Sequence, residues 1–165
     1  MGTLLFIHPL LVWAAGDMDV ISITGNITAS SCKVDSDSLN VPVLLGSHIS
    51  RSDLSKANST TPWVEFHLKV INCPAVTTKA TVTFSGKADT ANPDSMYAND
   101  GTAKNVAIEL QGMQGEALGN GKSLTGTVAT DRTYTFDLQA RTFSATGNAS
   151  AGDISSAVTA TFTYQ

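Results

Sequence analysis

The chain has 165 residues, a hydrophobic fraction of 42% and a net charge of −4, which suits one domain with a hydrophobic core. Charged residues make up only 15% of the chain and form no Lys/Arg cluster. This excludes the basic surface that is typical of proteins binding nucleic acid or an anionic membrane. Low charge together with abundant Thr, Ser, Ala, Gly and Val residues predicts an all-β extracytoplasmic protein.

Residues 1–16 are expected to form a signal peptide. The segment is apolar from Leu4 to Trp13 and ends in small residues, and it is too short to span a bilayer. The n-region is atypical, because no Lys or Arg precedes the apolar run. A buried N-terminal strand or helix is the alternative. Cleavage near Gly16 leaves one mature domain, residues 17–165.

The mature chain begins with a strand pattern over residues 17–28. One face carries Ile21, Ile23, Gly25 and Ile27, and polar residues alternate with them, as expected of a β-strand with one buried face. Its apolar face must be covered, either within its own domain as an edge strand or by another subunit. The residue pattern alone leaves both possibilities open.

The chain contains two cysteines, Cys32 and Cys73. In an exported protein an even number of cysteines favours a disulfide bond. Closing a loop of about 40 residues would stabilise the fold by about 4 kcal/mol in the chain-entropy model. Two free buried thiols are the alternative.

Further strands are expected where apolar and polar residues alternate, with Gly, Asn, Asp and Pro residues between them. Pro42 would place the first of these strands at an edge or a bulge. About eight strands and no clear helix predict a β-sandwich. The expected ranges are 39–45, 62–72, 79–86, 105–111, 123–129, 132–143 and 153–165, with loops at 46–61 (including one helical turn near 53–57) and 87–104, and a glycine-rich hairpin connection at 112–121.

No catalytic or metal-binding constellation is evident, so we expect neither an enzyme nor a cofactor. The three histidines, His8, His48 and His67, lack the spacing of metal ligands. No serine lies in a G-x-S-x-G elbow. The acidic residues fall mainly in turn sequences, and the glycines of 112–121 lack the dinucleotide-binding spacing.

An ordered set of motifs resembles the subunits of chaperone–usher pili, and most closely the minor adaptor subunits of type 1 fimbriae. The set comprises the N-terminal alternating strand with its central glycine, ASSCKV around Cys32, VINCPA around Cys73, TVTFSGKAD, GTAKNVAIELQ and the C-terminal TATFTYQ. The resemblance covers essentially all of residues 17–165.

This resemblance implies an immunoglobulin-like β-sandwich that lacks one strand and is completed by a donor strand from another subunit. The partners would be a periplasmic chaperone, an outer-membrane usher and neighbouring pilus subunits, and the location would be a fimbrium at the cell surface. Donor-strand residues would be Ile21, Ile23, Gly25 and Ile27, with Asp19 outermost. Cys32 and Cys73 match the family disulfide, and Val158, Phe162 and Tyr164 would lie on the C-terminal strand beside the groove.

Three other functions remain as alternatives. The chain could be a major rod pilin of the same family, although similarity around residues 72–86 favours an adaptor. It could be a self-complete secreted β-sandwich that binds carbohydrate, or a small secreted enzyme, which no motif supports. We expect no second, receptor-binding domain, since the length is too short for a two-domain tip adhesin.

Overall fold

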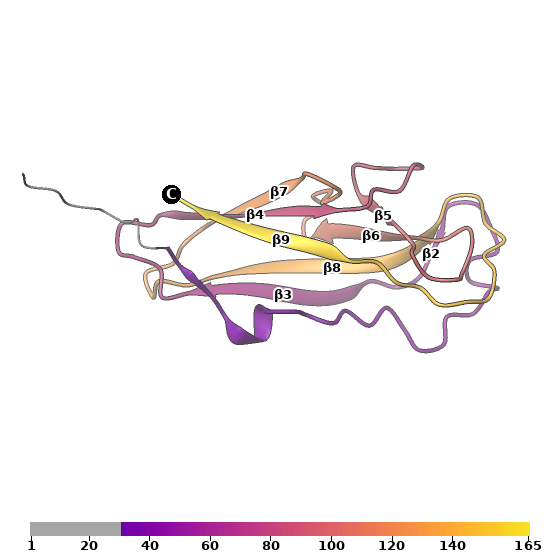
Figure 1. Cartoon of the computed structure of the whole chain (residues 1–165), viewed down its shortest axis with the longest axis horizontal. Helices are drawn as coiled ribbons and strands as arrows, with labels where there is room; N and C mark the ends of the chain where they lie inside the picture. Colours follow the sequence, from indigo (N-terminus) through magenta and orange to yellow (C-terminus); the bar gives the residue numbers. More distant parts are fainter. Residues whose placement is uncertain (1–30) are drawn as a thin grey trace, which may run out of the picture.

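The computed structural model describes residues 31–165, which fold into nine β-strands and one short 3₁₀ helix (Figure 1). The expected signal peptide and the expected donor strand, including Asp19, Ile21, Ile23, Gly25 and Ile27, lie outside the described residues. The elements are β1 (Lys33–Val34), η1 (Ser36–Ser38), β2 (Ser59–Thr60), β3 (Val64–Ile71), β4 (Lys79–Gly86), β5 (Met96–Ala98), β6 (Ala107–Gly112), β7 (Ser123–Thr127), β8 (Tyr134–Ser144) and β9 (Val158–Tyr164).

The strands form two antiparallel sheets that pack face to face. The larger sheet has the order β1-β3-β8-β6-β5, with β2 on β8, and the smaller sheet has the order β7-β4-β9. The long strands β3, β4, β8 and β9 run along the long axis of the molecule (Figure 1). The described residues therefore form the β-sandwich that the sequence predicts, and none of their helices is long and apolar enough to cross a membrane.

Alternating side chains build the core between the sheets. Val70 on β3, Val82 on β4 and Phe136 on β8 are fully buried, and each lies within a range where the sequence predicts a strand. The register places Leu68 opposite Phe136 and Val70 opposite Tyr134. Burying such side chains contributes about 1.5–3 kcal/mol each, so these strands hold the sandwich together.

Hydroxyl side chains cover the outer face of the smaller sheet. The Thr81 and Thr125 hydroxyls are 2.7 Å apart, and those of Thr83 and Ser123 are 2.8 Å apart. Such cross-strand pairs stabilise a solvent-facing sheet without placing charge on it. The smaller sheet is therefore apolar inside and polar outside.

The outer face of the larger sheet carries one buried ion pair. The Arg141 Nε lies 2.6 Å from a carboxylate oxygen of Glu109, directly across the β6–β8 ladder. The Arg141 guanidinium also stacks over the Trp63 ring, 4.0 Å from the ring centroid, and the Glu109 side chain is only 8% exposed. The pair therefore joins two central strands.

Several details of the prediction are wrong. Residues 112–121 fold back on the end of β6 only locally, through an antiparallel bridge between Gln111 and Ala117. They do not connect paired strands, because β6 belongs to the larger sheet and β7 pairs with β4 of the smaller sheet. The helical turn expected near 53–57 is a set of β-type turns, with Leu54 N–H donating to the Arg51 carbonyl. Strands β2 and β5 fall in the expected loops, since two or three residues are too few to show alternation.

Candidate functional site

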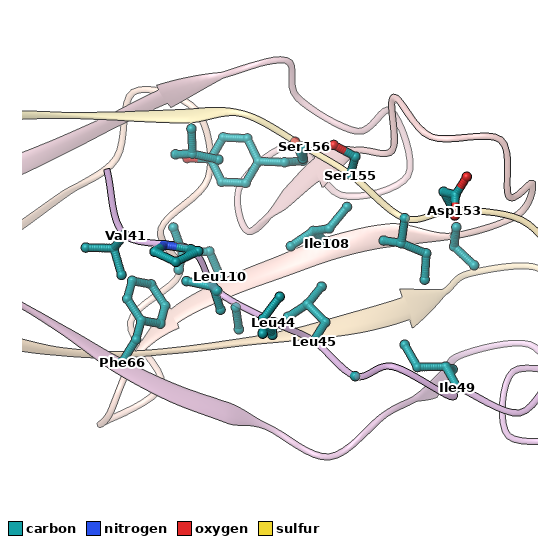
Figure 2. Close-up of a pocket in the computed structure, with 18 of the residues that line it drawn as sticks. Val41, Leu44, Leu45, Ile49, Phe66, Ile108, Leu110, Asp153, Ser155 and Ser156 are labelled. Atoms are coloured by element: carbon teal, nitrogen blue, oxygen red, sulfur yellow. The ribbon is translucent and has the colours of Figure 1, made fainter. Parts of the chain in front are cut away.

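A long apolar groove lies between the two sheets and has a volume of about 1160 Å³. One wall is β9 together with residues 150–157, and the opposite wall is residues 38–51. The floor includes Phe66, Ile108 and Leu110 from the larger sheet, and Figure 2 shows Ile108 and Leu110 between the two walls. The groove is thus a slot along the core whose floor is the hydrophobic interior itself.

The β9 wall presents an unpaired strand edge. In the part of the chain that the structure describes, β9 pairs only with β4, from Val158 opposite Gly86 to Tyr164 opposite Ala80. The edge of β9 that faces the groove therefore offers its backbone N–H and C=O groups to a further strand. Between residues 31 and 165, the buried Ser156 hydroxyl in this wall also has no hydrogen-bond partner.

The opposite wall corrects the strand expected at residues 39–45. These residues form no strand, and among the described residues no backbone–backbone hydrogen bond involves residues 40–49. Side-chain burial nevertheless alternates, with Val41, Val43 and Leu45 half-buried and Pro42 and Leu44 exposed. The segment has the pattern of a strand without a ladder partner, and Pro42 removes one of the N–H groups that a ladder would use.

The three residues expected beside the groove have different positions. Val158 and Phe162 line it, and the Phe162 ring packs against Phe136 with the ring centroids 6.0 Å apart. Tyr164 packs against the core but does not line the groove, and burial raises its pKa above the usual value of 10. The sequence did not reveal that Tyr97 and Ile154 also line the groove, because Tyr97 falls in an expected loop.

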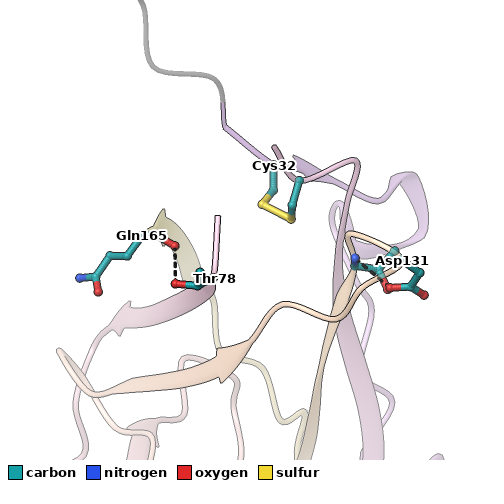
Figure 3. The surroundings of a disulfide bond; sticks show 6 residues. Cys32, Thr78, Asp131 and Gln165 are labelled. Carbon is teal, nitrogen blue, oxygen red and sulfur yellow. Dashed lines mark hydrogen bonds between the residues drawn. A yellow bond between two sulfur atoms is a disulfide. The ribbon is translucent and has the colours of Figure 1, made fainter. Parts of the chain in front are cut away.

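A disulfide bond joins Cys32 and Cys73 at one end of the sandwich (Figure 3). It closes a loop of 41 residues and ties the residue before β1 to the chain just after β3. The C-terminus lies at this same end, where the carbonyl oxygen of Gln165 accepts hydrogen bonds from the N–H groups of Thr78 and Lys79. The predicted pairing is therefore present, and the described chain begins and ends at one pole.

The described residues contain no group of three His, Cys, Asp or Glu side chains arranged to hold a metal ion. His67 lies opposite Asp137 on the outer face of the larger sheet, away from the groove. The groove itself is lined by few titratable residues, among them His48, Arg51 and Asp153. Its chemistry is that of a surface for an extended apolar peptide segment.

Comparisons with known proteins agree on one family. The family model described as "Fimbrial protein" matches residues 21–165. Protein FimG of Escherichia coli K12 is 34% identical over 145 residues, which cover 87% of this chain and 83% of that protein. The S-fimbrial adhesin protein SfaS of Escherichia coli strain 536 is 38% identical over 146 residues, with the same shares.

A solved structure of a chaperone–usher pilus shows the same fold. The similarity has a TM-score of 0.68 at 17% identity and covers 96% of this chain and all of that chain. At this identity the likeness establishes the fold, an immunoglobulin-like sandwich of the pilin type.

Proposed function

This chain belongs to the fimbrial protein family and is a subunit of surface fimbriae, and we propose that it polymerises by donor-strand exchange as a minor adaptor subunit. The observation that carries the exchange step is the apolar groove between the free edge of β9 and residues 38–51. A single extended strand from a neighbouring subunit would fill it. The chain's own residues 17–28 would in turn fill a neighbour's groove.

The chemistry of the expected donor strand suits such a groove. Ile21, Ile23 and Ile27 fall on one face, and burying the three together would contribute about 5–9 kcal/mol. Gly25 would permit close approach where the groove floor is filled. Because ladder hydrogen bonds form along the whole strand at once, the joint would dissociate very slowly without a covalent link.

The same exposed groove explains why a periplasmic chaperone and an outer-membrane usher would be needed. An open apolar slot beside an unpaired strand edge promotes aggregation. A chaperone strand would cover the slot during export, and the usher would be the place where the neighbour's strand replaces it. The adaptor role rests on the sequence similarity around residues 72–86, and a major rod pilin is the alternative.

A pair of substitutions on opposite faces of the donor strand tests the exchange. Ile23→Asp should block polymer growth and leave chaperone binding intact, because only the donated face changes. Thr24→Asp is the matched control, since Thr24 lies on the other face, and it should polymerise normally. Normal incorporation of the Ile23→Asp variant would refute the donor assignment.

Two further measurements separate the alternatives. Residues 17–165, and the same chain without residues 17–25, should both need a chaperone or an added donor peptide to stay soluble. A stable monomer without either would instead indicate a self-complete sandwich. Quantitative mass spectrometry of purified fimbriae should find far fewer copies of an adaptor than of the most abundant subunit, whereas a rod pilin would itself be the most abundant.

A further inference from the structure

The two walls of the groove are held in very different ways. Residues 40–49 make no backbone–backbone hydrogen bond among the described residues, so that wall has no fixed ladder geometry. The opposite wall is fixed at two places. From Val158 onward it pairs with β4, and at residues 153–155 it is bonded to the loop that follows β5.

Asn99 is the centre of that second attachment. Its side-chain oxygen accepts hydrogen bonds from the Gly101 N–H (3.0 Å) and the Ser155 N–H (2.8 Å). Its amide nitrogen donates to the carbonyl oxygens of Ala103 (2.9 Å) and Asp153 (3.4 Å). The side chain of one asparagine therefore uses both its acceptor and its donor capacity, and half of its bonds go to the groove wall.

Backbone contacts complete the attachment. The Asp100 N–H donates to the Ser155 carbonyl (2.8 Å), and the Ala103 N–H donates to the Asp153 carbonyl (3.1 Å). Gly101 is required for the close approach, because a Cβ there would overlap the Asp153 carbonyl oxygen. In Figure 2, Asp153, Ser155 and Ser156 follow one another along the upper wall of the groove.

We propose that Asn99 is a positioning residue for donor-strand exchange: it holds residues 153–155 so that the groove-facing edge of β9 is a preformed template for the incoming strand. The proposal rests on the function proposed above and names the residue that prepares the acceptor. An incoming strand must match the β9 edge in register before its side chains reach the floor. Residues 40–49 form no backbone–backbone hydrogen bonds among the described residues and cannot fix this register, so the β9 wall must fix it.

The test uses the full mature chain delivered in complex with its periplasmic chaperone. The donor is a fluorescent synthetic peptide of residues 17–28 that carries Asp19→Val, so that no carboxylate of the peptide has to enter the apolar groove. Asn99→Ala removes all four side-chain bonds, and we expect the peptide to associate about tenfold more slowly. Asn99→Asp keeps both acceptor bonds and should recover part of the loss. Gly101→Ala leaves Asn99 intact but displaces the wall, so it should slow association as Asn99→Ala does.

Asp131→Ala is the matched control. Asp131 also bonds a backbone N–H, that of Thr133 (3.1 Å), but it lies outside the groove lining and next to β8 rather than β9, so association should be unchanged. Amide exchange gives a second readout: the Asn99 variants should lose protection along β9 while Leu68 and Phe136 in the core keep theirs. A uniform loss of protection would mean that Asn99 only stabilises the fold.

The test separates a failure of the Asn99 positioning role from a failure of the proposed function. If the wild-type chain does not take up the Asp19→Val peptide, strand uptake by this groove is refuted, and the proposed exchange fails with it. If the wild type takes it up and Asn99→Ala does so equally fast, the positioning role is refuted. Should Asn99→Ala fail to fold, Asn99→Asp and Gly101→Ala decide the question by the same two readouts.

Discussion

Tyr97 supports the groove floor through one buried polar group. Its side chain is fully buried, and its hydroxyl donates a hydrogen bond to the Leu118 carbonyl at 2.9 Å. Burial disfavours the charged phenolate and raises the pKa of Tyr97 from 10 to about 12. The folded state therefore holds this proton more tightly than the unfolded state does.

This difference predicts a loss of stability in alkali. The contribution of a raised pKa is fully present below the unfolded value near 10 and is lost as the pH rises to about 12. The free energy of unfolding should fall by about 2–3 kcal/mol more in the wild type than in Tyr97→Phe across that range. Denaturant unfolding of both chains in complex with the 17–28 peptide, between pH 8 and 12, checks the difference. Parallel pH profiles would contradict it.

At the scale of the element, the long strands follow from the sequence, whereas residues 38–51 and 150–157 of the groove walls do not. The ranges 62–72, 79–86 and 132–143 coincide closely with β3, β4 and β8, because hydrophobic alternation there reflects burial against a facing sheet. The range 153–165 was too long. Its first residues are held by Asn99 and neighbouring backbone groups rather than by a strand, and no local pattern reports bonds to a residue more than fifty positions away.

The range 39–45 failed for a different reason. Its alternation is real, since Val41, Val43 and Leu45 are half-buried, but strand formation also needs a partner ladder. Sequence alternation reports the face that is to be buried and not whether the partner belongs to the same chain. Residues 39–45 have no ladder because no strand lies beside them in the groove.

We therefore predict that residues 39–45 become a strand when the groove is filled. In the chain with its groove uncovered, the amides of residues 40–49 should exchange rapidly, because they lack ladder hydrogen bonds. Adding the 17–28 peptide should protect alternate amides there, whereas the amides of β3 should change little. Hydrogen-exchange mass spectrometry measures both segments together. Unchanged exchange at residues 40–49 upon binding would show that this wall does not pair with the donor.

At the scale of the whole molecule, the groove has two different ends. Asp153 lies towards one end and Val41 towards the other (Figure 2). Every strand pairing in the described residues is antiparallel. A donor strand that joins β9 in the same sense would place its N-terminal end beside Phe162.

Under that geometry Asp19 makes this chain a poor acceptor of its own donor strand. In a donor strand Asp19 would share a face with Ile21, and an unpaired carboxylate against apolar side chains costs several kcal/mol. A neighbour whose groove has a cation at that position would be preferred, which would suit the proposed adaptor role. In fluorescence anisotropy, a 17–28 peptide with Asp19→Val should bind this chain at least about tenfold more tightly than the natural peptide. Ser22→Val, on the other face, should leave the affinity nearly unchanged. Equal binding of the natural and Asp19→Val peptides would place Asp19 outside the groove and leave a homopolymeric rod as the simpler assembly.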